Sequence, residues 1–388
     1  DGDLTLTSGA TAGITDSGTV TVGGDLAATT DAGNGVIDMD QLAVDGSIAL
    51  VTDGNGAATV VNDAAIEFAA STVRGALTAT ATTGNITQSG ALAITGVTTI
   101  AADSGNNITL NNTSNNFQAA VRITSGNDVT LVDAGAIDLG ASTVSGTYAV
   151  TATAGGDITD SGALAITGAS TFTAAGGRSA TLNNGNDFDG TVTFAAASGN
   201  LKNVTITDTT VLDLSALTLA QVASAGGNLT ITTGGALTDS GALVIPGTTT
   251  ITATGQVVDL DHTSNNFATI LFGSSTNAVS SVEVVDTNAI AIGASKSTGN
   301  FTVTAGGDVI DSDTVTVGGN LSVTTSANDG LINMGTLEVN GTLALTTNGD
   351  GAATVVNDAE IDFAASTVGG ALSATATTGN ITQSGALD

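Results

Sequence analysis

The sequence predicts an all-β protein that folds as a parallel β-solenoid, a stack of short coils of the chain. Three observations predict this class: a repeat that runs through the chain without gaps, an alternation of apolar and polar residues, and frequent turn-forming residues with almost no proline. The 388 residues include 52 Gly and one Pro.

A long repeat organises the chain. The segment from Asp16 to Leu92 returns from Asp311 to Leu387, shifted by 295 residues without a gap, and about 70% of its positions are identical. Inside it lies a shorter signature, typically apolar-Thr-Asp/Gln-Ser-Gly-Ala-Leu, which recurs at intervals of 72, 72, 79, 72 and 72 residues. Such internal periods are typical of solenoids. The copies of the signature begin at Ile14, Ile86, Ile158, Leu237, Val309 and Ile381.

Within each module of about 72 residues, apolar residues alternate with Thr, as in Ile108-Thr109-Leu110 and Leu229-Thr230-Ile231. A period of two is typical of half-buried strands. Clusters such as Ser104-Gly105-Asn106-Asn107 and Ser125-Gly126-Asn127-Asp128 separate these runs, and their residues favour turns. The sequence therefore predicts short strands joined by tight turns, without helices.

The same strands could build a sandwich or a barrel, but tandem domains would need linkers and separate cores. A 72-residue core with 3% aromatic residues would be marginal, whereas stacked coils bury their faces on one another. We therefore predict one continuous solenoid over residues 1–388, with about three coils of roughly 24 residues per module and some 16 coils in all. Because it begins and ends inside modules, we expect the chain to be a piece of a longer protein.

Composition restricts the partners. The chain has 36 acidic and five basic residues, a formal net charge of -31, and no Cys. Binding of nucleic acid or anionic lipid headgroups relies on Lys and Arg, so neither partner is expected for this surface. No apolar run reaches the roughly 18 residues of a membrane span, so membrane insertion is not expected. With 41% hydrophobic residues, the chain can nevertheless bury a core.

A short Asn-rich motif recurs at matching module positions. We interpret it as a corner, with Asn in the turn, bonded to a neighbouring coil, and Phe in the core; a ligand site is the alternative. The three copies are Asn115-Asn116-Phe117, Asn186-Asp187-Phe188 and Asn265-Asn266-Phe267.

The run Gly156 to Gly168 (GDITDSGALAITG) and its copies resemble the repeats of filamentous haemagglutinin-like adhesins, the large exoproteins of two-partner secretion in Gram-negative bacteria. The similarity covers essentially the whole chain. It implies a right-handed parallel β-helix that is exported through an outer-membrane partner and serves as a stalk for adhesion or biofilm matrix. The resemblance lies in scaffold positions, so it transfers no functional residues.

Catalytic residues are not expected. Asp259 and Asp261 flank Leu260 beside His262, and residues two apart on a strand share a face. Glycoside hydrolysis needs a carboxylate pair at a set separation, but only this copy of the module has one, and a solvated turn explains it better. His262 alone does not make a transition-metal site, which usually needs several His or Cys ligands.

Calcium is the cofactor that fits best, although none is expected to be built in. Asp53-Gly54-Asn55-Gly56 and its copy Asn348-Gly349-Asp350-Gly351 resemble the start of an EF-hand loop, but the Gly and Glu required later in that loop are missing. We interpret both as tight turns. Adventitious surface Ca²⁺ is the remaining alternative.

Two further patterns follow from the repeat itself. The Asn-x-Ser/Thr sequons are interpreted as turn residues before a strand, with glycosylation as the alternative. Thr-x-Thr runs such as Thr5-Leu6-Thr7, Thr19-Val20-Thr21 and Thr314-Val315-Thr316 are interpreted as outward strand residues rather than an ice-binding face. The sequons lie at Asn85, Asn107, Asn203, Asn228, Asn300, Asn320, Asn340 and Asn380.

These observations predict a structural protein: a repeat region of an extracellular or bacterial cell-surface filament, in a stalk, biofilm matrix or sheath, without catalysis. Its expected partners are other copies of itself, in filaments or lateral bundles. A solenoid module that binds surface or matrix carbohydrate or a receptor is the main alternative, and a β-helical polysaccharide lyase or hydrolase is a third.

Overall fold

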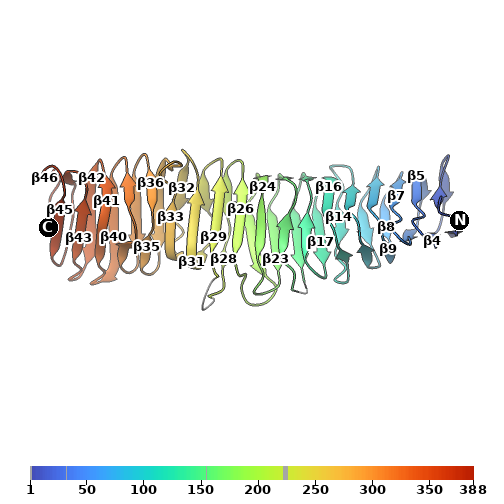
Figure 1. The fold of residues 1–388 in the computed structure, drawn as a ribbon, viewed down its shortest axis with the longest axis horizontal. Coiled ribbons are helices and arrows are strands. Elements are labelled where there is room, and N and C mark those ends of the chain that lie inside the picture. The colour runs from blue at the N-terminus through green and yellow to red at the C-terminus, as the bar shows by residue number, and fades with distance from the viewer. Residues whose placement is uncertain (1, 32, 154, 222–225) are drawn as a thin grey trace. The chain divides into compact units, whose positions relative to one another are not determined.

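A computed structural model describes residues 2–31, 33–153, 155–221 and 226–388, and it confirms the predicted fold class. The protein is an all-β parallel β-solenoid with about 18 turns of about 21 residues, and its described residues include no helix. The turn is thus close to the predicted 24 residues. Figure 1 shows strands of successive turns lying side by side, each in parallel register with the next, as for Leu4↔Leu26 and Leu26↔Ile48.

The chain forms two compact units, which are described separately: residues 1–190 with 195–199, and residues 191–194 with 200–388. In the first unit, strands of two sheets alternate along the chain. Sheet A contains β1 (Leu4–Ser8), β4 (Leu26–Thr30), β6 (Ser47–Val51), β8 (Ile66–Phe68), β9 (Ser71–Val73), β11 (Ile86–Gln88), β12 (Leu92–Ile94), β14 (Ile108–Leu110), β15 (Asn116–Phe117), β17 (Val129–Asp133), β20 (Tyr148–Ala152) and β23 (Ser170–Ala174). Sheet B contains β2 (Ile14–Thr15), β3 (Val20–Val22), β5 (Ile37–Val44), β7 (Ala58–Asn62), β10 (Leu77–Ala81), β13 (Thr98–Ala101), β16 (Val121–Ser125), β18 (Ile137–Leu139), β19 (Ser142–Val144), β21 (Ile158–Asp160), β22 (Leu164–Ile166) and β24 (Ala180–Phe188).

The second unit repeats this plan. Sheet C contains β25 (Val192–Ala196, whose last residues belong to the first unit), β27 (Leu212–Leu214), β30 (Leu237–Asp239), β32 (Val257–Leu260), β34 (Ser281–Asp286), β37 (Phe301–Ala305), β40 (Leu321–Asn328), β42 (Thr342–Asn348), β44 (Ile361–Phe363) and β46 (Ile381–Gln383). Sheet D contains β26 (Val204–Asp208), β28 (Leu217–Thr218), β29 (Leu229–Thr233), β31 (Leu243–Thr252), β33 (Asn266–Phe272), β35 (Ile290–Ile292), β36 (Ser295–Ser297), β38 (Val309–Asp311), β39 (Val315–Val317), β41 (Ile332–Val339), β43 (Ala353–Asn357) and β45 (Leu372–Ala376).

Most turns consist of one straight strand and one bent side. The straight strand is about five residues long, such as β10, and the bent side is a pair of short strands, such as β11 and β12, separated by Ser89-Gly90-Ala91. Side chains alternate between the interior and the surface: Leu77, Ala79 and Ala81 are buried, whereas Thr78 and Thr80 point outward. The predicted period of two therefore sets which residues form the core.

The interior is filled by columns of apolar side chains stacked in register. Ile86, Ile108 and Val129 form one such column, and each is at most 1% exposed. Phe172 makes edge-to-face contacts with Tyr148 and Phe188, with ring centroids 6.1 and 5.9 Å apart. The hydrophobic effect favours this arrangement, and stacking in register lets narrow coils share one core.

Close stacking explains the glycines of the turns. A Cβ atom on Gly156 would lie 2.1 Å from the backbone nitrogen of Ala136 one turn below, so a larger residue would push the two turns apart. An Asx residue follows many of these glycines, and its side-chain oxygen accepts the backbone N–H of the matching residue one turn on. Asn85 bonds Asn107 in this way at 2.8 Å, and Asn107 bonds Asp128 at 3.1 Å.

The repeat and the coil have different periods. In sheet B, Ile14 is followed one turn later by Ile37, then by Ala58 and then by Leu77, which uses 63 of the 72 residues of the module. The remaining nine residues lead to Ile86, which lies in sheet A. One module therefore occupies three and a half turns.

The copies of the signature consequently alternate between sheets. In the first unit Ile14 and Ile158 lie in sheet B and Ile86 lies in sheet A; in the second unit Val309 lies in sheet D, opposite Leu237 and Ile381 in sheet C. The three and a half turns of the module are close to the predicted three coils, and the difference comes from the shorter turn. A 24-residue coil divides 72 evenly, but the observed 21-residue turn does not.

The half turn is made where two straight strands follow each other, as β6 and β7 do. At this point the straight strand β7 lies on the longer, bent strand β5 of the turn below. The last residues of β5 extend beyond the end of β7, so their backbone groups need other hydrogen-bond partners. Asn62, at the end of β7 and fully buried, supplies them: its Oδ1 accepts the N–H of Val44 at 2.8 Å and its Nδ2 donates to the Val44 carbonyl at 3.0 Å. We call such a residue the junction residue.

Each unit contains further junction residues at the matching place. Asn357 repeats the two bonds with Val339 at 2.8 and 3.0 Å. Asp133 accepts the N–H of Phe117 at 2.6 Å, and Asp286 accepts that of Phe267. Buried backbone donors are almost always paired, so a polar side chain is required in the core at this point.

Candidate functional site

The signature places a polar residue at the bend of the bent side to which it belongs. This third residue of the signature is Asp or Gln, and its side chain binds the bend of the next turn. Asp16, for example, accepts the N–H of Gln41 at 3.0 Å, and Asp311 accepts that of Gly335 at 2.9 Å. The conserved polar position of the signature is thus explained by contacts between turns.

The neutral version is Gln88. Its Nε2 donates to Oδ1 of Asn115 at 2.8 Å, and Asn115 Nδ2 donates back to Gln88 Oε1 at 2.9 Å. Asn115 also accepts the N–H of Leu92 at 2.9 Å. The predicted corner role of the Asn-rich motif is confirmed: Asn115 is fully buried and bonds the coil below, and Phe117 is 2% exposed in the core.

Asp160 is the fully paired acidic version. Its carboxylate accepts four hydrogen bonds of 2.9–3.1 Å, from the backbone N–H groups of Asn183 and Asn184 and from the side-chain amides of Asn184 and Asn186. It is 8% exposed. Multiple donors stabilise a buried carboxylate.

Asp239 is acidic but has fewer partners. Its Oδ2 accepts Nδ2 of Asn265 at 2.6 Å, and its Oδ1 accepts the N–H of His262 at 3.4 Å. Burial raises the pKa of Asp239 to about 6; the bonds from Asn265 and His262 offset part of this effect, and the nearby charge of Asp261 adds to it. This is the one place where the structure brings the sequence candidates Asp259, Asp261 and His262 near a buried carboxylate.

The Asp259–Asp261 pair does not form the face that the spacing suggested. Asp259 lies inside β32, half-buried, whereas Asp261 follows the strand and is exposed. The neighbour of Asp259 across the ladder is Glu283, in register on β34. Burial, followed by the charge of Asp261, raises the pKa of Asp259. Among the residues with described positions, no group of three or more His, Cys, Asp or Glu side chains could hold a metal ion.

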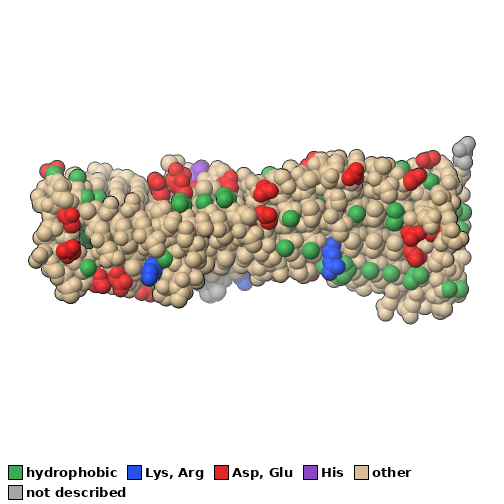
Figure 2. Space-filling view, turned by 90° about the horizontal axis from the view of Figure 1, so that it is seen from above, with side chains coloured by type: hydrophobic (Ala, Val, Ile, Leu, Met, Phe, Trp, Pro, Cys, Tyr) green, Lys and Arg blue, Asp and Glu red, His purple; other side chains and the backbone are tan. Residues whose placement is uncertain are grey.

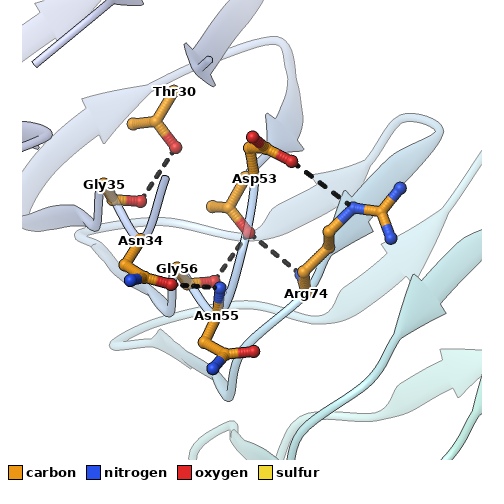
Figure 3. A network of polar contacts seen from close by, with 8 residues as sticks. Thr30, Asn34, Gly35, Asp53, Asn55, Gly56 and Arg74 are labelled. Carbon is orange, nitrogen blue, oxygen red and sulfur yellow. Dashed lines mark hydrogen bonds and ion pairs between the residues drawn. The ribbon is translucent and has the colours of Figure 1, made fainter. Parts of the chain in front are cut away.

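The Asp53 loop is a tight turn, as the sequence indicated (Figure 3). Gly54 has φ of +60°, and the N–H of Asn55 is bound at 2.7 Å by Oδ1 of Asn34 from the turn below. Thr52 closes the loop by donating to the Gly56 carbonyl at 2.6 Å. The copy of the loop is alike, since Thr347 donates to Gly351 at 2.7 Å.

The acidic loop side chain has an ion partner in this copy. Arg74 Nε lies 3.9 Å from Oδ1 of Asp53, and both side chains are more than half exposed. Such a surface pair contributes little stability. The residue that matches Arg74 in the later copy, 295 positions on, is Gly369.

Most sequons take part in the Asx ladder between turns. Asn203 accepts the N–H of Asn228, and Asn300 accepts that of Asn320, at 3.1 and 3.0 Å. Asn228 and Asn320 in turn accept the N–H groups of Thr248 and Thr342, both at 2.9 Å. Their turn role is confirmed by these contacts.

Outward Thr residues form short ranks on the straight strands. Thr205, Thr230 and Thr250 are in register on successive turns. Each half-turn junction interrupts these ranks of Thr, because the straight strands of the following turns belong to the other sheet. The outward strand role of Thr that the sequence suggested is therefore confirmed.

Charge is distributed unevenly between the two kinds of side. On the straight strands, the outward residues are nearly all Thr, Ala, Val or Ser, with Arg122 and Glu283 as the charged exceptions in the described strands. The bent sides and turns carry most acidic residues, such as Asp38, Glu67 and Asp213. Figure 2 shows acidic side chains in small separate groups on a surface that is mostly neutral.

The fold and its buried polar signature define a repeat protein of the parallel β-solenoid class. The chain belongs to the family described as Repeats of unknown function (DUF5649), whose model matches residues 55–124, 126–195, 201–272, 278–333 and 350–388. No curated protein and no solved structure matches the chain. In the described part of the chain, no helix is long and apolar enough to cross a membrane.

Proposed function

We propose that this chain is a structural repeat region of a secreted or cell-surface bacterial filament, in a stalk, biofilm matrix or sheath, and that it carries no catalytic activity. The observation that carries the proposal is the half-turn junction inside the module. Asn62 and Asp133 satisfy the backbone at this point in two successive modules, so the hydrogen-bonded ladder continues from one module to the next without a linker.

The surface supports lateral assembly of such filaments. A chain with a formal net charge of -31 repels its own copies wherever acidic groups face each other. The straight strands present uncharged Thr and Ala, as on β20 and β23. Because the module turns by half a turn, these neutral strands alternate between sheets A and B, so one chain offers surfaces for neighbours on both sheets.

Two measurements test the proposal. Electron microscopy of purified chains with two, four and eight modules should show rods that lengthen by about 17 Å per module, three and a half turns at about 4.8 Å each. Immunogold labelling with antibodies against this chain should mark fibres outside the producing cell. Compact particles whose length does not grow with module number, or label confined to the cytoplasm, would contradict the proposal.

Carbohydrate binding is a second candidate, favoured by one groove in the second unit. The groove has a volume of about 420 Å³ and is lined in part by the amide side chains of Asn200, Gln221 and Asn266. Amides can donate to and accept from sugar hydroxyls. A glycan array would test this candidate, with Asn266→Ala expected to abolish any specific signal.

A further inference from the structure

Asp239 differs from its counterparts in how well its charge is compensated. In three successive modules the third signature residue is Gln88, then Asp160, then Asp239. Each side chain binds an Asn of the next bend: Asn115, Asn186 and Asn265 respectively. The comparison thus holds the backbone environment nearly constant while the chemistry of the group changes.

The number of donors separates the two carboxylates. Asp160 accepts four bonds of 2.9–3.1 Å, two from backbone N–H groups and two from side-chain amides. Asp239 accepts one short bond, at 2.6 Å, and one long bond, at 3.4 Å. Both side chains are at most 9% exposed, so water does not replace the missing donors. An undercompensated buried carboxylate favours its protonated form.

The ionisable groups near Asp239 do not supply the missing positive charge. Asp261 and His262, from the bend above, act on it in opposite directions. On the strand below, Asp213 accepts Thr238 Oγ1 at 3.4 Å, and Asp259 lies in register with Thr238 on the strand above. Asp213 and Asp259 therefore flank the outward Thr238, and the charged groups that act on Asp239 itself are Asp261 and His262.

We propose that Asp239 is a proton-binding latch: with a proton bound, its carboxyl group fastens the bend of residues 260–267 to strand β30, and loss of the proton in neutral solution loosens that bend. The pKa of Asp239, raised by burial to about 6, agrees with the geometry. Since the folded pKa lies above the ordinary 3.8, the folded state holds the proton more tightly than the unfolded state. Stability from this group is therefore present in acid and is lost as the pH rises from about 4 through about 6.

This latch would make the bend bound by Asp239 respond to mild acid, whereas the matching bend bound by Gln88 has no such carboxylate. Gln88 shows that a neutral amide fits the same position, because it pairs with Asn115 through two bonds. The inference does not depend on the proposed filament function, since it concerns local opening of the fold alone.

Hydrogen–deuterium exchange of the full chain tests the latch. For peptides covering residues 257–265, which leave out Phe267 because its N–H is bound by the buried Asp286, exchange corrected for the intrinsic rate should be on the order of tenfold slower at pH 5.0 than at pH 7.5. Peptides covering residues 108–115, opposite Gln88, leave out Phe117, whose N–H is bound by Asp133; they report the general effect of pH on this acidic chain and should change much less. Asp239→Asn should give pH-independent protection in residues 257–265.

The control variant is Asp160→Asn. It removes a charged acceptor that four donors bind, so it should loosen its own bend, residues 182–188, at both pH values and leave residues 257–265 unchanged. Equal corrected exchange of residues 257–265 at pH 5.0 and 7.5 in the unmodified chain would overturn the proposal, as would a pH dependence of these residues that persists in Asp239→Asn. The first comparison needs no variant, so the test holds even if a variant fails to fold.

Discussion

Asn62 binds both backbone groups of Val44, accepting from its N–H at 2.8 Å and donating to its carbonyl at 3.0 Å. The straight strand β7 is too short to pair with the end of the bent strand β5. The Asn62 side chain therefore supplies the hydrogen bonds that a neighbouring strand would otherwise give to Val44. Asn357 makes the same contacts to Val339. The half-turn inside the module therefore has a specific chemical cause in the core.

We predict that Asn62→Ala lowers the free energy of unfolding of its module by about 1–3 kcal/mol, the usual cost of leaving a buried polar group unpaired. Urea denaturation followed by circular dichroism measures the change. Asn116→Ala is the control, because Asn116 is an exposed residue of β15, and it should change stability by less than about 0.5 kcal/mol. Equal effects of the two variants would show that Asn62 has no special role.

The alternation of signatures between sheets can be tested by cross-linking, since the chain has no Cys. Thr109 and Thr130 are outward residues in register on adjacent turns, so cysteines at both positions should form a disulfide under oxidation. Asp38 and Thr59 are outward residues in register where the straight strand β7 lies on the bent strand β5, which is the contact that the half-turn creates. Cysteines there should also form a disulfide within one chain, and an unlinked monomer in non-reducing gels would contradict the half-turn.

The sequence predicts the strands but not the half-turn, for physical reasons. Alternation such as Leu77-Thr78-Ala79 identifies the buried residues directly, because side chains on a strand alternate between faces. The number of residues in a turn depends on how tightly the corners stack, which no local pattern reports. Asn62, in the run Val-Val-Asn-Asp-Ala, has the composition of a turn, so its burial becomes evident only when Val44 is seen beneath it. The partners of Asp239 were missed for the same reason, since they lie 23 and 26 residues away.

The aromatic stack is expected to stabilise the first unit strongly. Phe172 is fully buried between Tyr148 and Phe188, so Phe172→Ala should cost about 3–5 kcal/mol through lost burial and an unfilled cavity. Phe172→Leu keeps most of the volume and should cost clearly less. Thermal unfolding of both variants beside the unmodified chain measures the difference, and similar losses would argue against a packed interior at this position.

The buried carboxylates should make the fold more stable in mild acid than at neutral pH. Burial raises the pKa of Asp133, Asp239 and Asp286 above the ordinary value of 3.8. As the pH falls toward 4, the folded state therefore binds more protons than the unfolded state. The melting temperature should accordingly be higher at pH 5 than at pH 7.

Repulsion among surface acids would act in the same direction, and salt separates the two causes. Screening by 0.5 M NaCl weakens interactions between exposed charges but has little effect on buried groups. We expect the difference between pH 5 and pH 7 to persist in salt. Its disappearance would assign the effect to the surface charge alone.

Removing one whole turn should preserve the second unit. Phe301 lies directly under Leu321 in register, and each follows a Gly-Asn pair, so deletion of residues 301–320 rejoins Asn300 to Leu321 in the native sequence context. Every later strand then keeps its sheet. Circular dichroism should show the same strand content per residue, with a melting temperature within a few degrees of the full chain.

Removing only half a turn should fail unless a junction residue is supplied. Deletion of residues 309–320 makes β37 run directly into β40, so two straight strands follow each other as at a natural junction. The fifth residue of the second strand, at the position that Asn62 holds in β7, is Thr325. It is buried but too short to reach the unpaired backbone of the bent side below. We expect this deletion to destabilise the unit, and the added change Thr325→Asn to recover about 1–3 kcal/mol of the loss. In the full chain the same Thr325→Asn change has no unpaired backbone to satisfy and removes the bond from Thr325 to the Gly330 carbonyl, so it should lower the stability. A stabilising effect in the full chain, or no recovery in the deletion variant, would mean that the junction side chain does not determine the half-turn.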